Sequence, residues 1–456
     1  LGSNLSGALY VLDEPTIGLH ARDNHQLLDA LGKLRARGNS VVVVEHDEDT
    51  MARADFIVDL GPGAGVEGGE VVASGTLKQI LRNKNSVTGL ELGRQRDGGQ
   101  ALGQARSTNP PLAKRGGKNK TPSLVFKNLR KNNLKNLSVA IPLGRFVAVS
   151  GVSGSGKSTM VRECVLPELK AALKAKRGNR SLEGLEWIKA VHEVDQSPIG
   201  RTPRSVPATY VGFFDTIRQL FAQVPEARMR GFSPARFSFN SAQGRCPECK
   251  GAGTVKLEMN FLPPAFMTCV TCQGNRFSPE VLDILYNGKT IADVLELSVD
   301  EAAEFFGAIP KIHRALEALR DTGLGYLKLG QTSPTLSGGE AQRVRLVTHL
   351  LSGLSDSSRL KAETKKNLFI LEEPTIGLHM ADVRRLIGVI QRLVDAGHTV
   401  LVIEHNLDLI AAADWVIDLG PEGGEGGGEI IAQGPPGTIT KTMRSHTGRY
   451  LKRFFN

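Results

Sequence analysis

Residues 151–159 read Gly151-Val152-Ser153-Gly154-Ser155-Gly156-Lys157-Ser158-Thr159, which matches the phosphate-loop pattern G-x-x-x-x-G-K-[ST] and adds one residue to it. The glycines let successive backbone N–H groups turn toward phosphate oxygens, Lys157 supplies a positive charge, and the Ser158 hydroxyl is placed to bind Mg²⁺. An apolar run at 146–149 precedes the loop, and a helical pattern follows it as far as Leu166. This order of strand, loop and helix predicts a nucleotide-binding loop in an α/β fold.

The chain has 456 residues, enough for two or three domains that each bury a core. It has no run of 18 apolar residues, and residues 1–20 lack the charged start and apolar centre of a signal peptide. Four of the five cysteines form two close pairs, which fits a metal site in a reducing compartment better than a disulfide framework. We therefore expect a cytoplasmic protein without a membrane partner.

The net charge of +10 is concentrated in two segments. Residues 82–122 hold nine basic and two acidic side chains among many Gly, Gln and Asn residues, which predicts a flexible linker whose charge is solvated. Residues 197–276 hold ten basic and four acidic side chains. Aromatic residues are interleaved with these arginines, a mixture that favours phosphate contacts beside an apolar or stacking surface: Tyr210, Phe213, Phe214, Phe221, Phe232, Phe237 and Phe239.

An internal repeat organises the rest of the chain. Residues 11–75 align without a gap with residues 370–434, so that each residue has its counterpart 359 positions later. The pattern of each copy predicts a strand, which is followed by the turn Glu-Pro-Thr-Ile-Gly-Leu-His, a helix and a second strand. The second strands, at 41–44 and 400–403, are runs of aliphatic residues, which are typical of strands buried on both faces of a parallel sheet.

The two copies differ in what precedes them. The second copy has the phosphate loop upstream, whereas only twelve residues precede Asp13 in the first. We therefore expect an incomplete first unit, in a chain that is a fragment or a truncated product. The predicted domains are a truncated C-terminal lobe at 1–84, a basic linker at 85–122, and a second domain at 123–456 that carries a large insertion at about 165–330.

Two cysteine pairs lie in this insertion, Cys246 with Cys249 and Cys269 with Cys272, separated by 19 residues. The spacing falls within the pattern C-x₂-C-x₁₅₋₂₀-C-x₂-C, which is typical of zinc sites. Four thiolates complete a tetrahedral Zn²⁺, so that no position is left for catalysis and the ion would be structural. Disulfide pairing is the alternative, and it is uncommon in a reducing compartment. The pattern predicts a zinc module at 246–272.

Glu372 and Glu373 end the predicted first strand of the second copy, at the sheet edge where a parallel fold collects its ligands. A phosphate loop needs a carboxylate for Mg²⁺ and a second group that orients the attacking water, and these two residues fit both roles. A capped loop without a catalytic role is the alternative. His405 ends the next strand, from which it could reach a terminal phosphate or make only loop hydrogen bonds.

One further stretch resembles an ABC-type ATPase. Residues 336–343, Leu-Ser-Gly-Gly-Glu-Ala-Gln-Arg, are similar to the ABC signature. The chain order also resembles that superfamily, because the phosphate loop is followed by Gln196, the signature, Glu-Glu-Pro-Thr and the pair Glu404-His405.

Three features narrow the resemblance to the UvrA family, the damage-recognition subunits of the bacterial excinuclease. They are the stretch at 194–205, the four-cysteine insertion with Phe261-Leu262-Pro263, and the tandem Glu-Pro-Thr-Ile-Gly-Leu-His copies. The resemblance implies an α/β fold class, namely an ABC-type P-loop ATPase domain with a large zinc-containing α+β insertion, preceded by a partial second ABC ATPase lobe.

The resemblance also implies roles for single residues. The phosphate loop would hold ATP with Mg²⁺, and Glu372 would complete the metal site. Gln196 would sense the γ-phosphate, Glu373 would polarise the attacking water, and His405 would contact the γ-phosphate. The signature would serve the nucleotide of a partner half through Ser337, Gly338 and Gly339.

By the same resemblance, the zinc-bearing insertion would help to grip damaged double-stranded DNA. The candidates for phosphate contacts are Arg201, Arg204, Arg245 and Lys250, with a solvated face as the alternative. Incision of the DNA would belong to other subunits. The chain would form a homodimer or pair with the absent N-terminal half, and the contact with the family's UvrB partner would lie outside this chain.

The chain departs from the family at Glu372, where the family usually has Asp. The extra methylene moves the carboxylate by about an ångström or more, and Mg²⁺ demands near-octahedral geometry, so slower ATP hydrolysis is a hypothesis. Two other functions stay open, a module that binds ATP and DNA without turnover and the ATPase of a transporter. The transporter is disfavoured because a four-cysteine insertion has no evident role beside a membrane subunit.

Overall fold

The computed structural model describes residues 5–63, 68–96, 122–175, 181–259, 262–354 and 365–455. It divides into two compact units, one formed by residues 1–195 and 353–456 and the other by residues 196–352. The second unit takes the place of the expected insertion at 165–330, with different bounds. Helix α5 (Leu166–Ala175) and strand β9 (Ile188–Val194) belong to the first unit, whereas nearly all of helix α13 (Gly338–Leu354), which carries the signature, belongs to the second.

The expected linker at 85–122 begins with a helix, α4 (Val87–Arg96). The rest of that linker, residues 97–121, lies outside the described residues, as does Phe261. No helix in the described ranges combines the length and the apolar character that crossing a bilayer requires.

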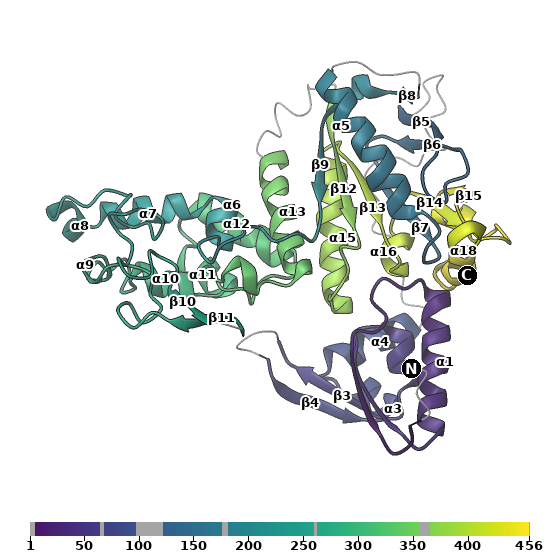
Figure 1. Cartoon of the computed structure of the whole chain (residues 1–456), viewed down its shortest axis with the longest axis horizontal. Coiled ribbons are helices and arrows are strands. Elements are labelled where there is room, and N and C mark those ends of the chain that lie inside the picture. The colour runs from purple at the N-terminus through teal and green to yellow at the C-terminus, as the bar shows by residue number, and fades with distance from the viewer. Residues whose placement is uncertain are drawn as a thin grey trace. The chain divides into compact units, whose positions relative to one another are not determined.

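A six-stranded sheet forms the core of the first unit (Figure 1). Its strand order is β15-β14-β7-β13-β12-β9, and neighbouring strands are parallel except for β15 beside β14. Every residue of β7 and β13 is buried, which confirms for 400–403 the prediction of a strand covered on both faces. Besides β9, the strands span β7 (Phe146–Gly151), β12 (Lys366–Glu372), β13 (Thr399–Ile403), β14 (Trp415–Gly420) and β15 (Glu429–Gly434).

Two layers of elements cover this sheet. A π-helical turn, η4 (Thr159–Val165), continues into α5, and Met160 and Leu169 of these elements pack in one apolar cluster with Val149 and Ile370 of the sheet. The same cluster takes in a small antiparallel sheet of order β6-β5-β8. Helix α15, which follows β12, buries a stripe of aliphatic side chains. These further elements are β5 (Ser123–Leu129), β6 (Leu137–Pro142), β8 (Leu182–Glu183) and α15 (Met380–Asp395).

The first repeat copy forms two separate strand pairs, β1 with β2 in parallel and β3 with β4 antiparallel. Leu9, Val11, Val42 and Val44 are 50–66% exposed, whereas their counterparts in β12 and β13 are at most 2% exposed. The prediction that 41–44 is buried on both faces is therefore wrong, because nothing equivalent to β7 and α5 covers this face in the described part of the chain. The bounds are β1 (Leu9–Asp13), α1 (Ala21–Ala36), β2 (Ser40–Val44), α2 (Glu48–Arg53), β3 (Ile57–Gly61), β4 (Glu70–Gly75) and α3 (Leu77–Arg82).

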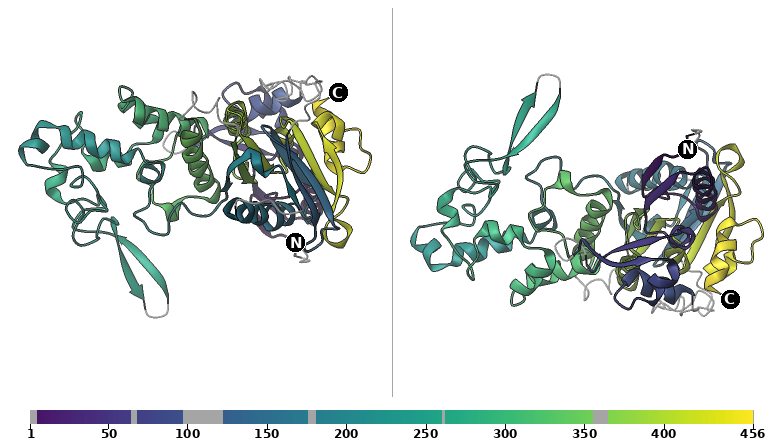
Figure 2. Two further views of the ribbon diagram at one scale, coloured as in Figure 1. Left: turned by 90° about the horizontal axis from the view of Figure 1, so that it is seen from above. Right: turned by 90° about the horizontal axis from the view of Figure 1, so that it is seen from below.

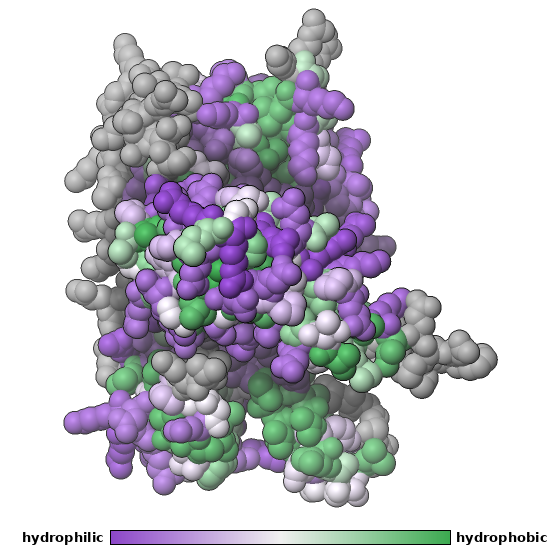
Figure 3. Space-filling model, turned by 90° about the vertical axis from the view of Figure 1, so that its left-hand side faces the viewer, coloured by the Kyte–Doolittle hydropathy of each residue, from purple (hydrophilic) through white to green (hydrophobic). Residues whose placement is uncertain are grey.

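Hydrophobic side chains gather at the lower end of the molecule in Figure 3, at the level of the first copy in Figure 1. The same copy provides many of the large apolar residues that are exposed in the described ranges: Leu5, Leu9, Val11, Ile17, Val42, Val44, Phe56, Val58, Leu60 and Val71.

The repeat extends beyond residue 75. Asp59 accepts hydrogen bonds from Ser86 and Thr88, and its counterpart Asp418 accepts them from Ser445 and Thr447, again 359 positions later. Helices α4 and α18 (His446–Leu451) begin directly after the two serines and contain the two threonines, and they are therefore equivalent. Two short helices, α16 (Leu407–Ala411) and α17 (Pro436–Ile439), complete the second copy.

The second unit is mostly helical, and a β-hairpin projects from its helices (Figure 2). Five of the seven aromatic residues expected to form an apolar or stacking surface are at most 3% exposed, and pairs such as Phe214 with Phe239 and Phe221 with Phe237 pack against each other in its core. The expectation is wrong for these five because their rings are buried in the core of the second unit, where Phe214 and Phe221 of α7 pack against the turn that carries Phe237 and Phe239. The bounds are α6 (Pro207–Val211), α7 (Phe214–Gln223), α8 (Pro225–Met229), β10 (Thr254–Met259), β11 (Leu262–Thr268), α9 (Pro279–Leu282), α10 (Ile291–Glu296), α11 (Val299–Phe305) and α12 (Pro310–Asp321).

Candidate functional site

The phosphate loop leaves β7 at Gly151 and leads into η4, as predicted. Gly151 has φ of 136°, and a Cβ there would lie 2.1 Å from the carbonyl oxygen of Leu419, so only glycine fits. The Nζ of Lys157 donates to the carbonyl oxygens of Gly151 and Val152, at 2.9 Å each. Burial lowers the pKa of Lys157 to about 8, so its ammonium group stays mostly charged at neutral pH.

The two acidic residues at the end of β12 point to different partners. The Oε1 atom of Glu372 accepts a hydrogen bond of 3.0 Å from Ser158 Oγ, so the two groups expected at a Mg²⁺ ion lie together. The Oε2 atom of Glu372 lies 2.7 Å from Nη1 of Arg162, a residue that belongs to no motif in the sequence. A serine hydroxyl and a carboxylate are oxygen ligands of the kind that Mg²⁺ prefers, so this pair fits the ion.

Glu373 pairs with His405, whose Nε2 lies 3.5 Å from Glu373 Oε1. The hydrogen bond from His405, assisted by the charges of His405 and Lys157, lowers the pKa of Glu373. Burial alone would raise this pKa, but its effect is the smaller one. The carboxylate is therefore charged at neutral pH. The first copy repeats this geometry, because His46 Nε2 lies 3.5 Å from Glu14 Oε1 and both glutamates have φ near +40°.

Glu404 holds the two loops of this site together. It is 2% exposed, and its carboxylate accepts hydrogen bonds from Thr375 and from the backbone N–H groups of His405 and Asn406. Glu45 makes the equivalent contacts in the first copy. Sequence reasoning gave this residue no role, although its place in both copies of the Glu-His pair was a signal that could have found it.

Residues of the first copy contact the phosphate loop of the second. The backbone N–H of Ser153 donates to Asp23 Oδ2 at 3.2 Å, and a Cβ on Gly18 would lie 3.4 Å from Glu373. The contacts are reciprocal: His20 Nε2 lies 3.1 Å from Thr447 Oγ1, and His379 Nε2 lies 3.2 Å from Thr88 Oγ1. The repeat copies therefore pack face to face, which their alignment alone did not predict.

His20 is buried in this contact between the copies. Its Nδ1 accepts a hydrogen bond from the backbone N–H of Arg22, so the proton of the neutral ring sits on Nε2. Burial, followed by the charges of His405 and Lys157, lowers the pKa of His20 to about 3. The folded chain therefore holds this ring neutral at pH values where an unfolded chain protonates it.

We expect this histidine to destabilise the fold in acid. As the pH falls from about 6.5 toward 3, the unfolded chain binds a proton at His20 that the folded chain does not, so the free energy of unfolding falls by up to about 1.4 kcal/mol per pH unit. Urea unfolding at pH 5 and pH 7 measures this loss. His20→Asn should lose about 2 kcal/mol less than the wild type over that interval. His313→Asn, on α12, is the control and should keep the wild-type difference; an equal difference in the His20 variant would contradict the assignment.

Gln196 and the signature lie together in the second unit. A Cβ on Gly338 would lie 3.2 Å from Gln196 Cβ. Ser337 and Glu340 form a capping box at the start of α13, because the N–H of Ser337 donates to Glu340 Oε2 at 2.7 Å and the N–H of Glu340 donates to Ser337 Oγ at 3.2 Å. Gly338 and Gly339 lie between these two residues, in the first turn of α13.

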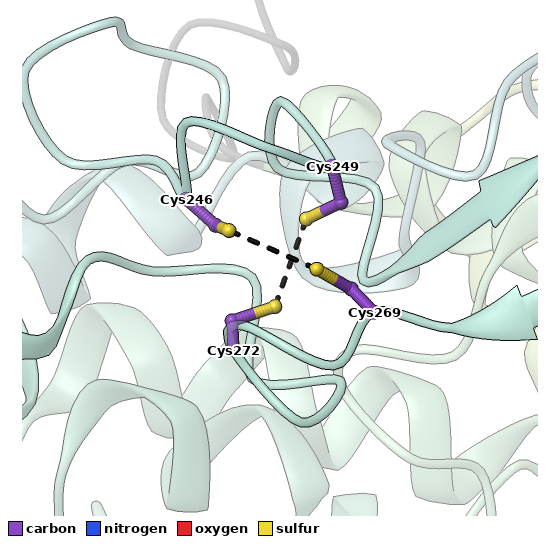
Figure 4. Close-up of side chains that lie close together, drawn as sticks. All are labelled: Cys246, Cys249, Cys269 and Cys272. Carbon is purple, nitrogen blue, oxygen red and sulfur yellow. Dashed lines mark hydrogen bonds between the residues drawn. The ribbon is translucent and has the colours of Figure 1, made fainter.

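The four cysteines converge in the second unit (Figure 4). Their sulfur atoms all lie within 4.8 Å of one another, with Cys246 Sγ 3.9 Å from Cys269 Sγ and Cys249 Sγ 3.6 Å from Cys272 Sγ. A tetrahedral zinc with Zn–S bonds of about 2.3 Å requires sulfur separations of about 3.8 Å. The cluster is buried and the thiols are free rather than in disulfides, so the residues fit Zn²⁺.

The proposed DNA contacts are open to solvent to different extents. Arg201, Arg204 and Lys250 are exposed, whereas Arg245 is half-buried. Lys250 lies in the loop after Cys249 with φ of 51°, at the edge of the zinc module. Exposure allows these side chains to contact DNA, but side chains that face only solvent are exposed as well.

No protein-family model matches the chain. UvrABC system protein A of Lactiplantibacillus plantarum is 52% identical over 456 residues, which cover 99% of this chain and 46% of that protein. The protein of the same name from Thermus thermophilus is 53% identical over 457 residues, with the same two shares. Among solved structures, UvrA2 from Deinococcus radiodurans has a TM-score of 0.84 and 45% identity, over 100% of this chain and 53% of that one.

The similarity covers both compact units, since it takes in essentially the whole chain. Together with the mostly parallel sheet of the first unit, it confirms the expected fold class, that of an ABC-type P-loop ATPase. The chain spans about half the length of the relatives that it matches. On these grounds the chain belongs to the UvrABC system protein A family.

Proposed function

We propose that the chain binds ATP with Mg²⁺ at the phosphate loop, hydrolyses it, and uses the nucleotide to control its grip on damaged double-stranded DNA. The observation that carries the proposal is the meeting of Lys157, the Ser158–Glu372 pair and the Glu373–His405 pair at one edge of the sheet. Relatives named as a component of the UvrABC system support the link to DNA repair.

Each residue of the site has one part in this proposal. Lys157 and the loop N–H groups bind the phosphates, and Ser158 with Glu372 holds Mg²⁺, which neutralises phosphate charge when bound. Glu373 accepts a hydrogen bond from the attacking water and is kept charged by His405, which also faces the γ-phosphate. Gln196 as γ-phosphate sensor, and Ser337, Gly338 and Gly339 as the cap on a partner's nucleotide, stay predictions.

We further propose that the second unit contacts the DNA backbone, with the zinc module holding its shape. Substituting Arg201 and Arg204 together by glutamine is expected to weaken binding to all duplexes alike and to lower the slope of log K against log salt by about 1 for each phosphate that is no longer neutralised. Titrations at several salt concentrations measure this slope. Arg35→Gln with Arg37→Gln, at the end of α1, is the matched control. An unchanged slope in the test pair would place these arginines on a solvated face.

Partners and location follow the same resemblance. We propose that the chain pairs with a second copy or with an N-terminal half, and the exposed apolar side chains of β1 and β2 support pairing. Sedimentation of the chain alone would test whether it forms a dimer. The absence of a UvrB contact and a cytoplasmic location stay predictions from the sequence.

The second candidate function is a module that binds ATP and DNA without turnover, favoured by the unusual Glu372. An ATP hydrolysis assay at saturating DNA separates the two. Turnover above the level of a Lys157→Ala variant supports the ATPase, and binding without turnover supports the module.

A further inference from the structure

Arg162 lies beside the proposed metal site. It sits in η4, four residues after Ser158. Its Nη1 atom is 2.7 Å from Glu372 Oε2, and its Nε is 3.5 Å from Glu193 Oε1. Lys170 also pairs with Glu193, at 2.9 Å, so that carboxylate is shared between two cations and does not neutralise Arg162 by itself.

The two oxygen atoms of Glu372 therefore serve two different groups. Oε1 faces the Ser158 hydroxyl, which is the side where Mg²⁺ is proposed to bind, and Oε2 faces the guanidinium of Arg162. An aspartate at 372 would hold its carboxylate closer to the backbone by one carbon–carbon bond, about 1.5 Å, and would not reach both groups at these distances. The contact with Arg162 thus explains why the longer side chain of glutamate fits position 372.

A fixed positive charge at this distance opposes a divalent cation on the same carboxylate. Arg162 is 44% exposed and Glu372 23% exposed, so water screens the repulsion without removing it. The guanidinium also holds Glu372 in one orientation through a charge-assisted hydrogen bond. Arg162 and Lys170 line a hollow of about 410 Å³ beside Ser158, so solvent and ions reach this side of the site.

We propose that Arg162 is a positioning residue that orients Glu372 and lowers the affinity of the phosphate-loop site for Mg²⁺. Nucleotide binding then needs a higher free Mg²⁺ concentration than the ligands alone would require. The inference rests on the proposed function, because it concerns the metal of the same ATP site.

The test measures the Mg²⁺ concentration that half-saturates binding of a fluorescent ATP analogue to the whole chain. Arg162→Gln is expected to lower this concentration about 3- to 10-fold, because it removes the charge and keeps a hydrogen-bond donor of similar reach. Arg162→Lys keeps the charge and should stay within about twofold of the wild type. Lys170→Gln, the matched control, removes a charge that pairs with Glu193 instead and should also stay within about twofold.

Glu372→Asp provides a second route to the same result. It withdraws the carboxylate from Arg162, so it should lower the Mg²⁺ requirement and abolish the further effect of Arg162→Gln in the double variant. A Mg²⁺ requirement that is unchanged or raised in Arg162→Gln would overturn the inference while leaving ATP binding intact. A wild-type chain that binds no nucleotide at any Mg²⁺ concentration would overturn both the inference and the proposed function. Thermal melts establish that each variant is folded.

Discussion

Glu373→Gln is expected to reduce ATP turnover at least 100-fold and to leave the affinity for ATP within about threefold of the wild type. Glutamine keeps the size and the hydrogen-bonding atoms of the side chain, but it cannot carry the charge that His405 stabilises in Glu373. A positioned base of this kind contributes about 10²- to 10⁴-fold to the rate, whereas phosphate binding depends on Lys157 and the loop N–H groups.

Steady-state release of phosphate and equilibrium binding of a fluorescent ATP analogue check the two halves of this prediction. Glu14→Gln is the matched control, because Glu14 has the same backbone conformation and the same histidine pairing in the first copy. No phosphate loop accompanies Glu14 in the described part of the chain, so its substitution should change turnover less than about threefold. Equal turnover in the wild type and Glu373→Gln would remove Glu373 from the proposed role.

The second large effect concerns the zinc module. Cys269→Ser is expected to abolish zinc binding and to unfold residues 246–272, because Cys269 is fully buried and its sulfur completes the four-sulfur cluster. Structural zinc contributes an apparent free energy of about 10–16 kcal/mol in small modules, as much as the total stability of many domains. The few apolar side chains packed around the four cysteines cannot replace that contribution.

Metal analysis should find one zinc per wild-type chain and none in Cys269→Ser, and hydrogen exchange should show loss of protection in β10 and β11. Cys164→Ser, in η4 of the first unit, is the control and should keep the zinc. ATP binding should survive in both variants, since the phosphate loop belongs to the first unit. Full protection of the hairpin after zinc loss would show that the metal does not hold this module together.

Local patterns were enough to predict the parts of the protein whose residues are close in sequence. The phosphate loop depends on glycines at fixed spacing within nine residues, and the cysteine pairs each span four. The repeat also predicted that Glu14 corresponds to Glu373 and His46 to His405. The structure shows the same local geometry for both Glu–His pairs. The local geometry agrees with these predictions because short loops are determined mainly by backbone conformation and by the chemistry of a few neighbouring side chains.

Burial was predicted less well. The phenylalanines of the second unit match a nucleic-acid surface in composition, yet most of them pack in its core. The aliphatic residues of β2 match a fully buried strand, yet half of them face solvent. Composition determines which residues favour burial, but only the neighbouring elements decide which faces are covered.

The sequence by itself determined that this chain has one phosphate loop, a repeated acidic turn and two cysteine pairs at zinc-site spacing, and these motifs predict nucleotide and zinc as its ligands. Only the tertiary structure decided that Asp23 contacts Ser153, that Arg162 pairs with Glu372, and that His20 is buried between the copies. These contacts involve residues that lie far apart in sequence or belong to no motif. Such contacts arise from the packing of whole elements, which brings together side chains whose own neighbours in the chain do not specify each other.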